Sequence, residues 1–468
     1  MTRDNLLGQL EAAPLSENAH PEMASEMASG LTGEQILRQQ RYQALGVNLS
    51  QYASVFQREA QREIVSRKNR GIGLTLAKSF ATRLVGQVPD PMMMTHIVTT
   101  RCNYMCSFCS FADTLNTKTD DLTLPEIEQV YATMGSNMNT IVYSGGETTL
   151  YTDLPQVIEA AYRLMPVKSV YIISNAWKPE RLFQITHHVM QRCPELHLTW
   201  SLSIEGPKEY NNIERRTKAA RWDAWQNTID TLEGLKAMRE HFGYRQLDVQ
   251  LCTVCSPGNH ELMMDWYETV RDVLQPDKWN LNLLRKSVQM TDHDMASFEE
   301  RRQSNQLEPF EQTYLNVTRR VKDDVLSGRL QFMYHTDNPM DGAMKSAVDL
   351  ISQDENRRTV TEEPNRVACL AGETGAYIGS TGAVSGCEEF ANNPVENKTY
   401  GSLREMGYDF QAIWRSEKAS LMRQKTGKAA ECRGCTLESQ RNYPSILVSL
   451  KNLGRAALLG RKIHKASK

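Results

Sequence analysis

The chain has 468 residues, of which 40% are hydrophobic and 24% are charged, a composition typical of a globular protein rather than a disordered one. Its 54 basic and 56 acidic residues give a formal net charge of −2, so the chain as a whole has no attraction for nucleic acid or anionic membranes. No apolar run has the roughly 18 residues of a membrane span, and the first residues do not form a signal peptide. We therefore expect a cytoplasmic protein, whose ten cysteines are reduced or bound to metal rather than joined in disulfides.

The first 90 residues are predicted to form a helical extension. The segments 32–61 and 63–84 have helical patterns without intervening strands, whereas residues 1–31 have a loose polar composition that predicts disorder.

Residues 91–300 are predicted to form an α/β domain, because short β-branched or apolar runs alternate there with longer amphipathic segments. Two helix starts support the alternation. Thr123 and Glu126 form a capping-box pattern, and Asp153 and Gln156 form another. The expected strands are 92–99, 139–144, 168–174, 197–204, 247–254 and 279–284.

Three cysteines follow the first predicted strand in the pattern Cys102-x3-Cys106-x2-Cys109, with Phe108 before the third. Four thiolates would complete a four-iron cluster, whereas three leave one iron open to another ligand. A structural zinc site is the weaker alternative, because such sites normally have four protein ligands.

This pattern resembles the CxxxCxΦC signature of the radical S-adenosylmethionine (SAM) superfamily. The resemblance implies a partial (β/α)6 TIM-like barrel, a 4Fe–4S cluster on Cys102, Cys106 and Cys109, and SAM bound to the open iron beside Phe108. It also implies that an external electron donor such as flavodoxin or ferredoxin reduces the cluster. SAM is then cleaved to a 5′-deoxyadenosyl radical that removes hydrogen from a substrate carbon.

Further candidate SAM contacts follow the next strands. Two adjacent glycines let the backbone approach a ligand closely, and the matching segment of the family binds the SAM amino group. The resemblance extends to Ser174-Asn175, where the family often contacts the ribose, and to residues 201–207 at the end of the fourth strand. Downstream, Arg216 could pair with the SAM carboxylate through a bidentate guanidinium, and Arg215 is an equal alternative. The candidates are Gly145, Gly146, Glu147, Ser174, Asn175, Ser203 and Arg216. Thr148 and Ala176 stand where the family usually has proline and glycine.

A proton acceptor would be needed if hydrogen removal leads to a net oxidation. By position alone, the candidates are Glu205, Tyr143 and His96. Cys252 and Cys255 lie three residues apart on a predicted strand and should point to opposite faces, so we expect separate buried thiols, as for Cys193.

A second cysteine set lies in the C-terminal part. Residues 301–360 predict a charged helical linker, and residues 361–440 predict a small cysteine-rich domain. A glycine-rich, hairpin-like stretch separates its first two cysteines. Spacing alone allows zinc or a 4Fe–4S cluster, but the pattern resembles the SPASM/twitch extension of radical SAM enzymes, which implies one auxiliary 4Fe–4S cluster. Its expected ligands are Cys369, Cys387, Cys432 and Cys435.

Residues 441–468 predict a basic amphipathic helix, which could touch a membrane surface or, as we favour, pack on the barrel.

For the reaction, the SPASM/twitch resemblance favours oxidation or bond formation during maturation of a ribosomally made peptide. Oxidation of a sugar, a lipid or another small molecule is the alternative. A non-enzymatic iron–sulfur redox sensor is the minor alternative. A purely structural site should have a complete set of protein ligands, whereas the three cysteines here leave one iron open.

Overall fold

The structure is a computed structural model. It describes residues 33–57, 64–65, 81–82, 86–109, 111–112, 114–117, 120–216, 222–284, 307–330, 339–361, 363, 369–391, 398–429, 432, 435–436 and 446–466. The predicted disorder of residues 1–31 and most of the predicted helix 63–84 lie outside these ranges.

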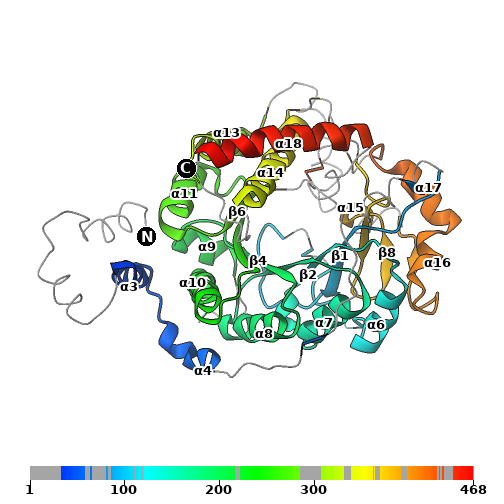
Figure 1. Cartoon of the computed structure of the whole chain (residues 1–468), viewed down its shortest axis with the longest axis horizontal. Helices are drawn as coiled ribbons and strands as arrows, with labels where there is room; N and C mark the ends of the chain where they lie inside the picture. Colours follow the sequence, from blue (N-terminus) through cyan, green and yellow to red (C-terminus); the bar gives the residue numbers. More distant parts are fainter. Residues whose placement is uncertain are drawn as a thin grey trace, which may run out of the picture.

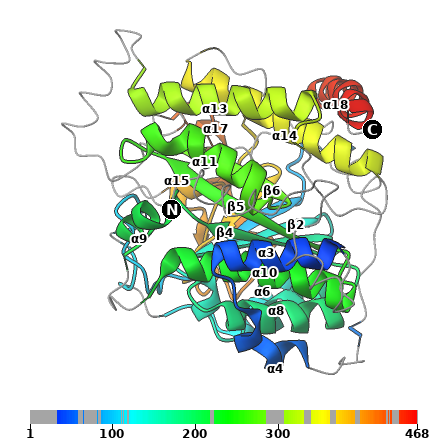
Figure 2. The same ribbon diagram turned by 90° about the vertical axis from the view of Figure 1, so that its left-hand side faces the viewer.

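Six parallel strands form the centre of the molecule, and helices pack around them (Figures 1 and 2). All six predicted strands are present, and their ends lie within one residue of the prediction. The strands are β1 (Met93–Thr99), β2 (Thr140–Gly145), β3 (Ser169–Ser174), β4 (His197–Ser203), β5 (Leu247–Cys255) and β6 (Lys278–Leu283). They lie side by side in chain order, which confirms the α/β fold with a partial TIM-like barrel.

Most of the intervening helices begin where the sequence has capping residues or proline. They are α6 (Leu124–Thr133), α7 (Leu154–Leu164), α8 (Pro179–Arg192), α9 (Lys208–Glu214), α10 (Ala224–Phe242), α11 (Met263–Thr269), η4 (Val270–Leu274) and α13 (Pro309–Leu326). The exceptions are α11 and η4. The predicted capping box of α6 is confirmed, since Glu126 accepts from the Thr123 backbone N at 2.7 Å. The second prediction was wrong in detail: α7 begins after Asp153, but that side chain makes no capping hydrogen bond.

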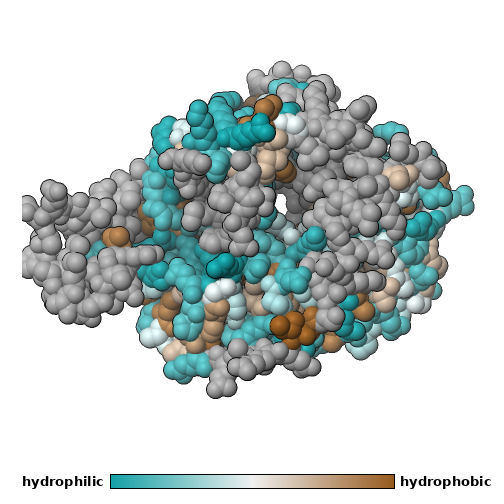
Figure 3. Space-filling view, viewed as in Figure 1, coloured by the Kyte–Doolittle hydropathy of each residue, from teal (hydrophilic) through white to brown (hydrophobic). Residues whose placement is uncertain are grey.

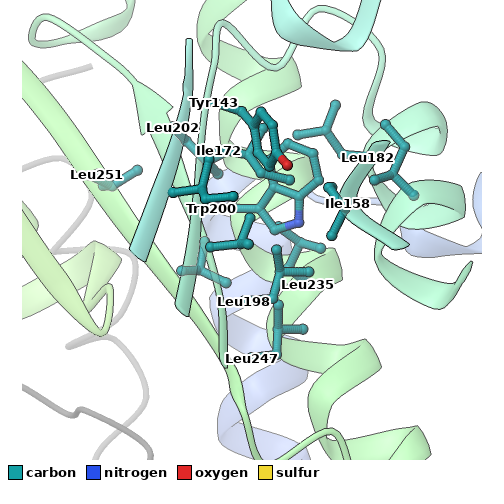
Figure 4. Packing of buried hydrophobic residues seen from close by; sticks show 14 of the residues in the cluster. Tyr143, Ile158, Ile172, Leu182, Leu198, Trp200, Leu202, Leu235, Leu247 and Leu251 are labelled. Carbon is teal, nitrogen blue, oxygen red and sulfur yellow. The ribbon is translucent and has the colours of Figure 1, made fainter. Parts of the chain in front are cut away.

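The hydrophobic core lies between the sheet and the outer helices (Figure 4). Because side chains alternate along a strand, every second residue points toward the helices. Trp200 of β4 is fully buried in this layer, and its indole Nε1 donates to Thr186 Oγ1 of α8 at 2.7 Å. Leu198 and Leu202, two residues before and after it, belong to the same cluster.

The N-terminal segment packs on the outside of the barrel. The predicted helix 32–61 is interrupted at Gly46, whose φ of 66° ends α3 (Gly33–Leu45) in a left-handed turn. The 3₁₀ helix η1 (Leu49–Tyr52) and α4 (Ala53–Phe56) follow. Arg41 of α3 pairs with Glu233 of α10 at 2.6 Å, so the extension is fixed to the barrel.

The C-terminal part continues the central sheet beyond β1. The predicted hairpin is present as β7 (Gly375–Ile378) and β8 (Ala383–Ser385), followed by β9 (Gly401–Ser402). β7 pairs in parallel with β1, and the strand order of the described sheet is β6-β5-β4-β3-β2-β1-β7-β8-β9. The short helices α15 (Glu388–Ala391), α16 (Phe410–Trp414) and α17 (Glu417–Lys425) complete this part.

The charged segment between barrel and cysteine-rich region forms helices with buried faces. Phe310 and Tyr314 of α13 lie in the core. The following helix, α14 (Pro339–Val360), packs against the C-terminal helix α18 (Ile446–Ala466) (Figure 1). Ala456 and Ile463 of α18 are buried, as the packing interpretation of the basic tail predicts.

The described surface has mixed character. Hydrophilic side chains dominate the described part of the face in Figure 3, with small groups of hydrophobic residues among them. Among the described helices, none combines the length and the apolar character needed to cross a membrane.

Candidate functional site

The cysteine loop follows β1 directly and brings three thiols near one another. Cys102, Cys106 and Cys109 are all half-buried. Burial, with smaller contributions from the neighbouring Cys106 and Cys109, raises the pKa of the Cys102 thiol to about 12. Burial likewise raises the pKa of Cys106 to about 11, against the lowering effect of Arg215. The loop therefore gathers the predicted cluster ligands beside one buried cation.

Asn116 fixes the first cysteine of the loop. Its side-chain Oδ1 accepts from the Cys102 backbone N at 3.0 Å, and its Nδ2 donates to the Cys102 carbonyl at 3.1 Å. Its backbone lies in the left-handed region with φ of 60°, which asparagine tolerates better than most residues. Sequence analysis missed this residue, since nothing in the local pattern connects position 116 with position 102.

The residues after α9 hold the other side of the loop. The Met105 backbone N donates to the Arg216 carbonyl at 2.8 Å, and the Ser107 backbone N donates to the Glu214 carbonyl at 3.3 Å. The Ser107 hydroxyl also bonds to the Glu214 carboxylate. A segment about 110 residues away in the sequence thus runs alongside the cysteine loop.

The glycine pair lies against the backbone of this loop. A Cβ on Gly145 would lie 2.3 Å from the Thr99 carbonyl oxygen, and one on Gly146 would lie 2.2 Å from the Arg101 carbonyl oxygen. Glycine is therefore required at these two positions because the chain's own backbone passes close by. The sequence analysis had instead expected a bound ligand at this distance. The pair brings the end of β2 to the cysteine loop, and its role toward SAM stays a prediction.

Glu147 is fully buried and joins three segments. Its Oε1 accepts from Ser174 Oγ at 2.7 Å and from Thr149 Oγ1 at 2.5 Å, and its Oε2 accepts from the Asn175 backbone N at 2.7 Å. Burial raises the pKa of the Glu147 carboxyl, and these hydrogen bonds oppose that increase. Its carboxylate therefore holds the predicted SAM-binding segments together.

Asn175 continues this arrangement toward the cysteines. Its Nδ2 donates to Asn103 Oδ1 at 3.0 Å, and Asn103 directly follows Cys102. The Nδ2 atom of Asn103 is buried and has no hydrogen-bond partner among the described residues. Ser203, the last predicted contact, ends β4 and is paired in register with Cys252. The unsatisfied donor beside the three thiols fits a polar ligand such as SAM.

The structure separates the two candidate arginines. Arg216 is exposed, and its carbonyl bonds to the cysteine loop. Arg215 is buried, its Nη1 lies 3.9 Å from Cys106 Sγ, and its guanidinium lies 5.5 Å from the centre of the Phe108 ring. Arg215 is thus the arginine that lies at the site.

The three guessed proton acceptors do not share this location. His96 and Tyr143 point away from the inside of the barrel, toward α6, where the His96 Nδ1 lies 2.8 Å from the Tyr131 hydroxyl (Figure 4 shows Tyr143). Glu205 does lie at the site, but its carboxylate pairs with Arg215. The position-based prediction was wrong for His96 and Tyr143, because the alternation of β1 and β2 turns both side chains toward the helices.

Cys252 and Cys255 have different neighbours, as predicted, but only Cys255 is buried, whereas Cys252 is half-buried. Cys252 Sγ accepts from Asn282 Nδ2 at 3.2 Å, whereas the Cys255 thiol donates to the Phe310 carbonyl at 3.3 Å.

The four C-terminal cysteines also come together. Burial raises the pKa of the Cys387 thiol well above its usual value, and Cys435, Cys369 and Cys432 raise it further. The Cys369 and Cys432 sulfurs accept from the backbone N atoms of Ala371 at 3.5 Å and Gly427 at 3.2 Å. One buried thiol beside three half-buried ones, two of which accept N–H hydrogen bonds, fits an iron–sulfur cluster. Across the described ranges, no three His, Cys, Asp or Glu side chains converge closely enough to hold a single metal ion.

Comparisons with known proteins agree with both sites. The model of the radical SAM superfamily matches residues 96–243, and that of the SPASM iron–sulfur cluster-binding domain matches residues 369–436. A search of curated proteins found no match.

Distant likeness to solved structures was also found. Native anSMEcpe with bound AdoMet is 13% identical, with a TM-score of 0.49 over 80% of this chain and 99% of that chain. Streptococcus suis SuiB bound to S-adenosylmethionine is 14% identical, with a TM-score of 0.48 over 90% of this chain and 86% of that chain. BtrN in complex with AdoMet and 2-DOIA is 12% identical, with a TM-score of 0.34 over 76% of this chain and 98% of that chain. We draw no function from likeness at this level.

The two family models together with the two cysteine sites identify the cofactors as SAM and 4Fe–4S clusters. The chain is a SAM-dependent iron–sulfur enzyme with a radical SAM domain over residues 96–243 and a SPASM domain over residues 369–436.

Proposed function

We propose that the enzyme removes a hydrogen atom from a carbon of a peptide substrate and passes an electron from the substrate to an auxiliary cluster, so that the net reaction is an oxidation or a bond formation. In this proposal Cys102, Cys106 and Cys109 hold the cluster that binds SAM, and the four C-terminal cysteines hold the auxiliary cluster. SAM and the reduced cluster, when bound, supply the one-electron chemistry that removes hydrogen from an unactivated carbon.

The connection between the two cysteine sets, through the shared sheet and through Glu388, is the observation that supports this proposal most. Burial raises the pKa of the Cys109 thiol, and the Glu388 carboxylate contributes to the increase. Glu388 directly follows Cys387 in the sequence. The two sites also belong to one sheet, because β7 pairs with β1. An electron released at the substrate would therefore have a second iron–sulfur site on the same sheet as its acceptor.

The side of the barrel interior formed by β4, β5 and β6 carries many polar side chains, which favours a polar substrate there. Leucine and tryptophan side chains of β4 and β5 point toward the helices (Figure 4), so the alternate positions face the barrel interior. On β4, β5 and β6 these positions include Ser201, Ser203, Gln250, Cys252, Asn280 and Asn282, together with the apolar Val254. Hydroxyl and amide groups can hydrogen-bond to peptide amides, whereas a lipid chain would favour apolar walls.

Anaerobic reconstitution tests the two cluster sites. The wild type should contain about eight irons per chain, and a Cys102/Cys106/Cys109→Ala variant should contain about four and lose dithionite-dependent cleavage of SAM. A Cys369/Cys387→Ala variant should also lose about four irons but retain cleavage of SAM. Cys193→Ala is the matched control, because this buried cysteine belongs to neither set. One zinc and about four irons in the wild type would contradict the proposed electron acceptor.

Whether the substrate is a peptide can be tested with peptides that are encoded next to the gene of this enzyme. Incubation with SAM and dithionite should lower the mass of the substrate peptide by two hydrogens, as measured by mass spectrometry. Conversion of a sugar or lipid with no change in any peptide would contradict the peptide proposal.

A further inference from the structure

Arg215 lies between the cysteine loop and the ends of β4 and β5, and its guanidinium has contacts on both sides. Nε and Nη2 both donate to Glu205 Oε1, at 2.9 and 2.5 Å. The remaining nitrogen, Nη1, lies 3.9 Å from Cys106 Sγ. The side chains of Arg215 and Glu205 are only 9% and 1% exposed. The guanidinium therefore presents one free edge to a predicted cluster ligand in a site with little water.

Glu205 is itself held firmly, which fixes the guanidinium. Its Oε2 accepts from the Val254 backbone N at 2.8 Å, and its own backbone N donates to Asn211 Oδ1 at 2.9 Å. Its carbonyl accepts from Asn259 Nδ2 at 3.1 Å. Contacts from α9, from β5 and from the turn after β5 thus set the position of the carboxylate.

The backbone around Arg215 does not depend on its side chain. The Arg216 and Glu214 carbonyls bond to the cysteine loop through backbone atoms, so these contacts should remain when the guanidinium is removed.

Hydrogen bonds to the sulfurs and nearby charge are the means by which a protein sets the reduction potential of an iron–sulfur cluster. A buried cation stabilises the added electron, and this effect is strong where water is excluded. We propose that Arg215 is a positioning residue that makes the SAM-binding cluster easier to reduce, by donating to Cys106 and by its charge, while Glu205 fixes the guanidinium and limits the effect of that charge. This inference rests on the proposed function, in that Cys102, Cys106 and Cys109 hold the cluster.

The proposal is tested by redox titration without SAM, and in parallel with SAM, followed by electron paramagnetic resonance. The signal of this cluster is the one absent from the Cys102/Cys106/Cys109→Ala variant. Arg215→Met should lower the ratio of reduced to oxidised cluster about tenfold at a fixed potential, a shift of about 59 mV to more negative potential for one electron. Arg215→Lys should give a smaller shift in the same direction, because it keeps the charge but loses the planar fork.

Glu205→Gln should shift the midpoint in the opposite direction, since it removes a negative charge. A residue that only supports the fold would not produce shifts of opposite sign. Lys208→Met is the matched control: it also removes one positive charge, but Lys208 pairs with Asp223 on the surface, and the midpoint should not change.

Three results would overturn the inference: an unchanged midpoint in Arg215→Met with full iron content, shifts of the same sign in Arg215→Met and Glu205→Gln, or a shift that occurs only when SAM is present. The last would make Arg215 a ligand of SAM rather than a partner of the cluster. If Arg215→Met fails to assemble the cluster, Arg215→Lys and Glu205→Gln decide by the sign of their shifts. A wild type that assembles no cluster on the three cysteines would instead contradict the proposed function.

Discussion

At the scale of single residues, buried polar groups decide how the site is held together. Glu147 is the clearest case, because its two carboxylate oxygens receive hydrogen bonds from Thr149, Ser174 and Asn175. Removing one partner from a buried hydrogen bond costs more free energy than the bond contributes. The remaining group is then left without a hydrogen-bond partner from either the protein or water.

We predict that Glu147→Ala lowers the free energy of unfolding by about 2–4 kcal/mol, since several buried donors lose their acceptor. It should also weaken SAM binding, because the loops that follow β2 and β3 are no longer joined. Denaturant unfolding and equilibrium dialysis with SAM would measure the two effects. Glu128→Ala, on the exposed side of α6, is the control. Unchanged stability and SAM affinity in Glu147→Ala would contradict this role.

His96 provides a prediction about pH. It is fully buried beside Tyr131, and burial lowers the pKa of its imidazole from 6.5 to about 3. The unfolded chain binds a proton below pH 6.5 and the folded chain does not, so stability falls as pH falls through that value. Between pH 6.5 and 5.5 the loss should be about 1 kcal/mol. Denaturant unfolding should show a shallower pH dependence in His96→Phe than in the wild type or in a His260→Gln control, and equal slopes would contradict the assignment.

At the scale of elements, the turn after β2 and the cysteine loop after β1 are packed backbone against backbone. Gly146 donates its N–H to the Thr99 carbonyl at 2.9 Å, and the Glu147 N–H bonds to the Arg101 carbonyl at 2.8 Å. This contact connects the C-terminal ends of β1 and β2, on which the site is built. Gly146 is therefore needed because it has no side chain, and less because its backbone is flexible.

We predict that Gly146→Ala displaces the cysteine loop, because the new Cβ would lie 2.2 Å from the Arg101 carbonyl oxygen. Overpacking of this kind costs about 1–3 kcal/mol, and iron content after reconstitution should fall by about four per chain. Gly454→Ala is the matched control, since a Cβ there would meet no atom within 4 Å. Full iron content in Gly146→Ala would show that the loop tolerates the displacement.

At the scale of the whole molecule, the C-terminal part joins the barrel through both backbone and side chains. Beyond the pairing of β7 with β1, Arg404 Nε donates to Glu126 Oε1 of α6 at 2.9 Å, and the Tyr408 hydroxyl donates to the same oxygen at 2.7 Å. The hydrogen bond from Arg404 holds the pKa of the Glu126 carboxyl well below its usual range. Glu126 therefore both caps α6 and anchors the C-terminal part.

A double-mutant cycle tests this anchor. Arg404→Ala and Glu126→Gln should each lower stability, and the coupling energy between them should be about 1–2 kcal/mol, because the two side chains form a charge-assisted hydrogen bond. Hydrogen exchange of the β7 and β8 amides should become faster in both variants. Additive effects, with no coupling, would show that the two residues contribute independently.

The sequence by itself determined the strands, the cysteine loop and the chemistry of the cofactors. Strand positions follow from local runs of β-branched and apolar residues, and the ends of all six agree with the structure to within one residue. The spacing of Cys102, Cys106 and Cys109 is equally local, because three ligands on one short loop can come together without help from distant residues.

Only the tertiary structure decided which of these residues act together. The register of a strand determines whether a side chain faces the barrel or the helices, and this turned His96 away from the site. The choice between Arg215 and Arg216 depends on how the segment after α9 lies against a loop more than 100 residues earlier in the chain, and the pairing of β7 with β1 joins segments still farther apart. Contacts of this range come from packing of the whole chain, which no local pattern of residues encodes.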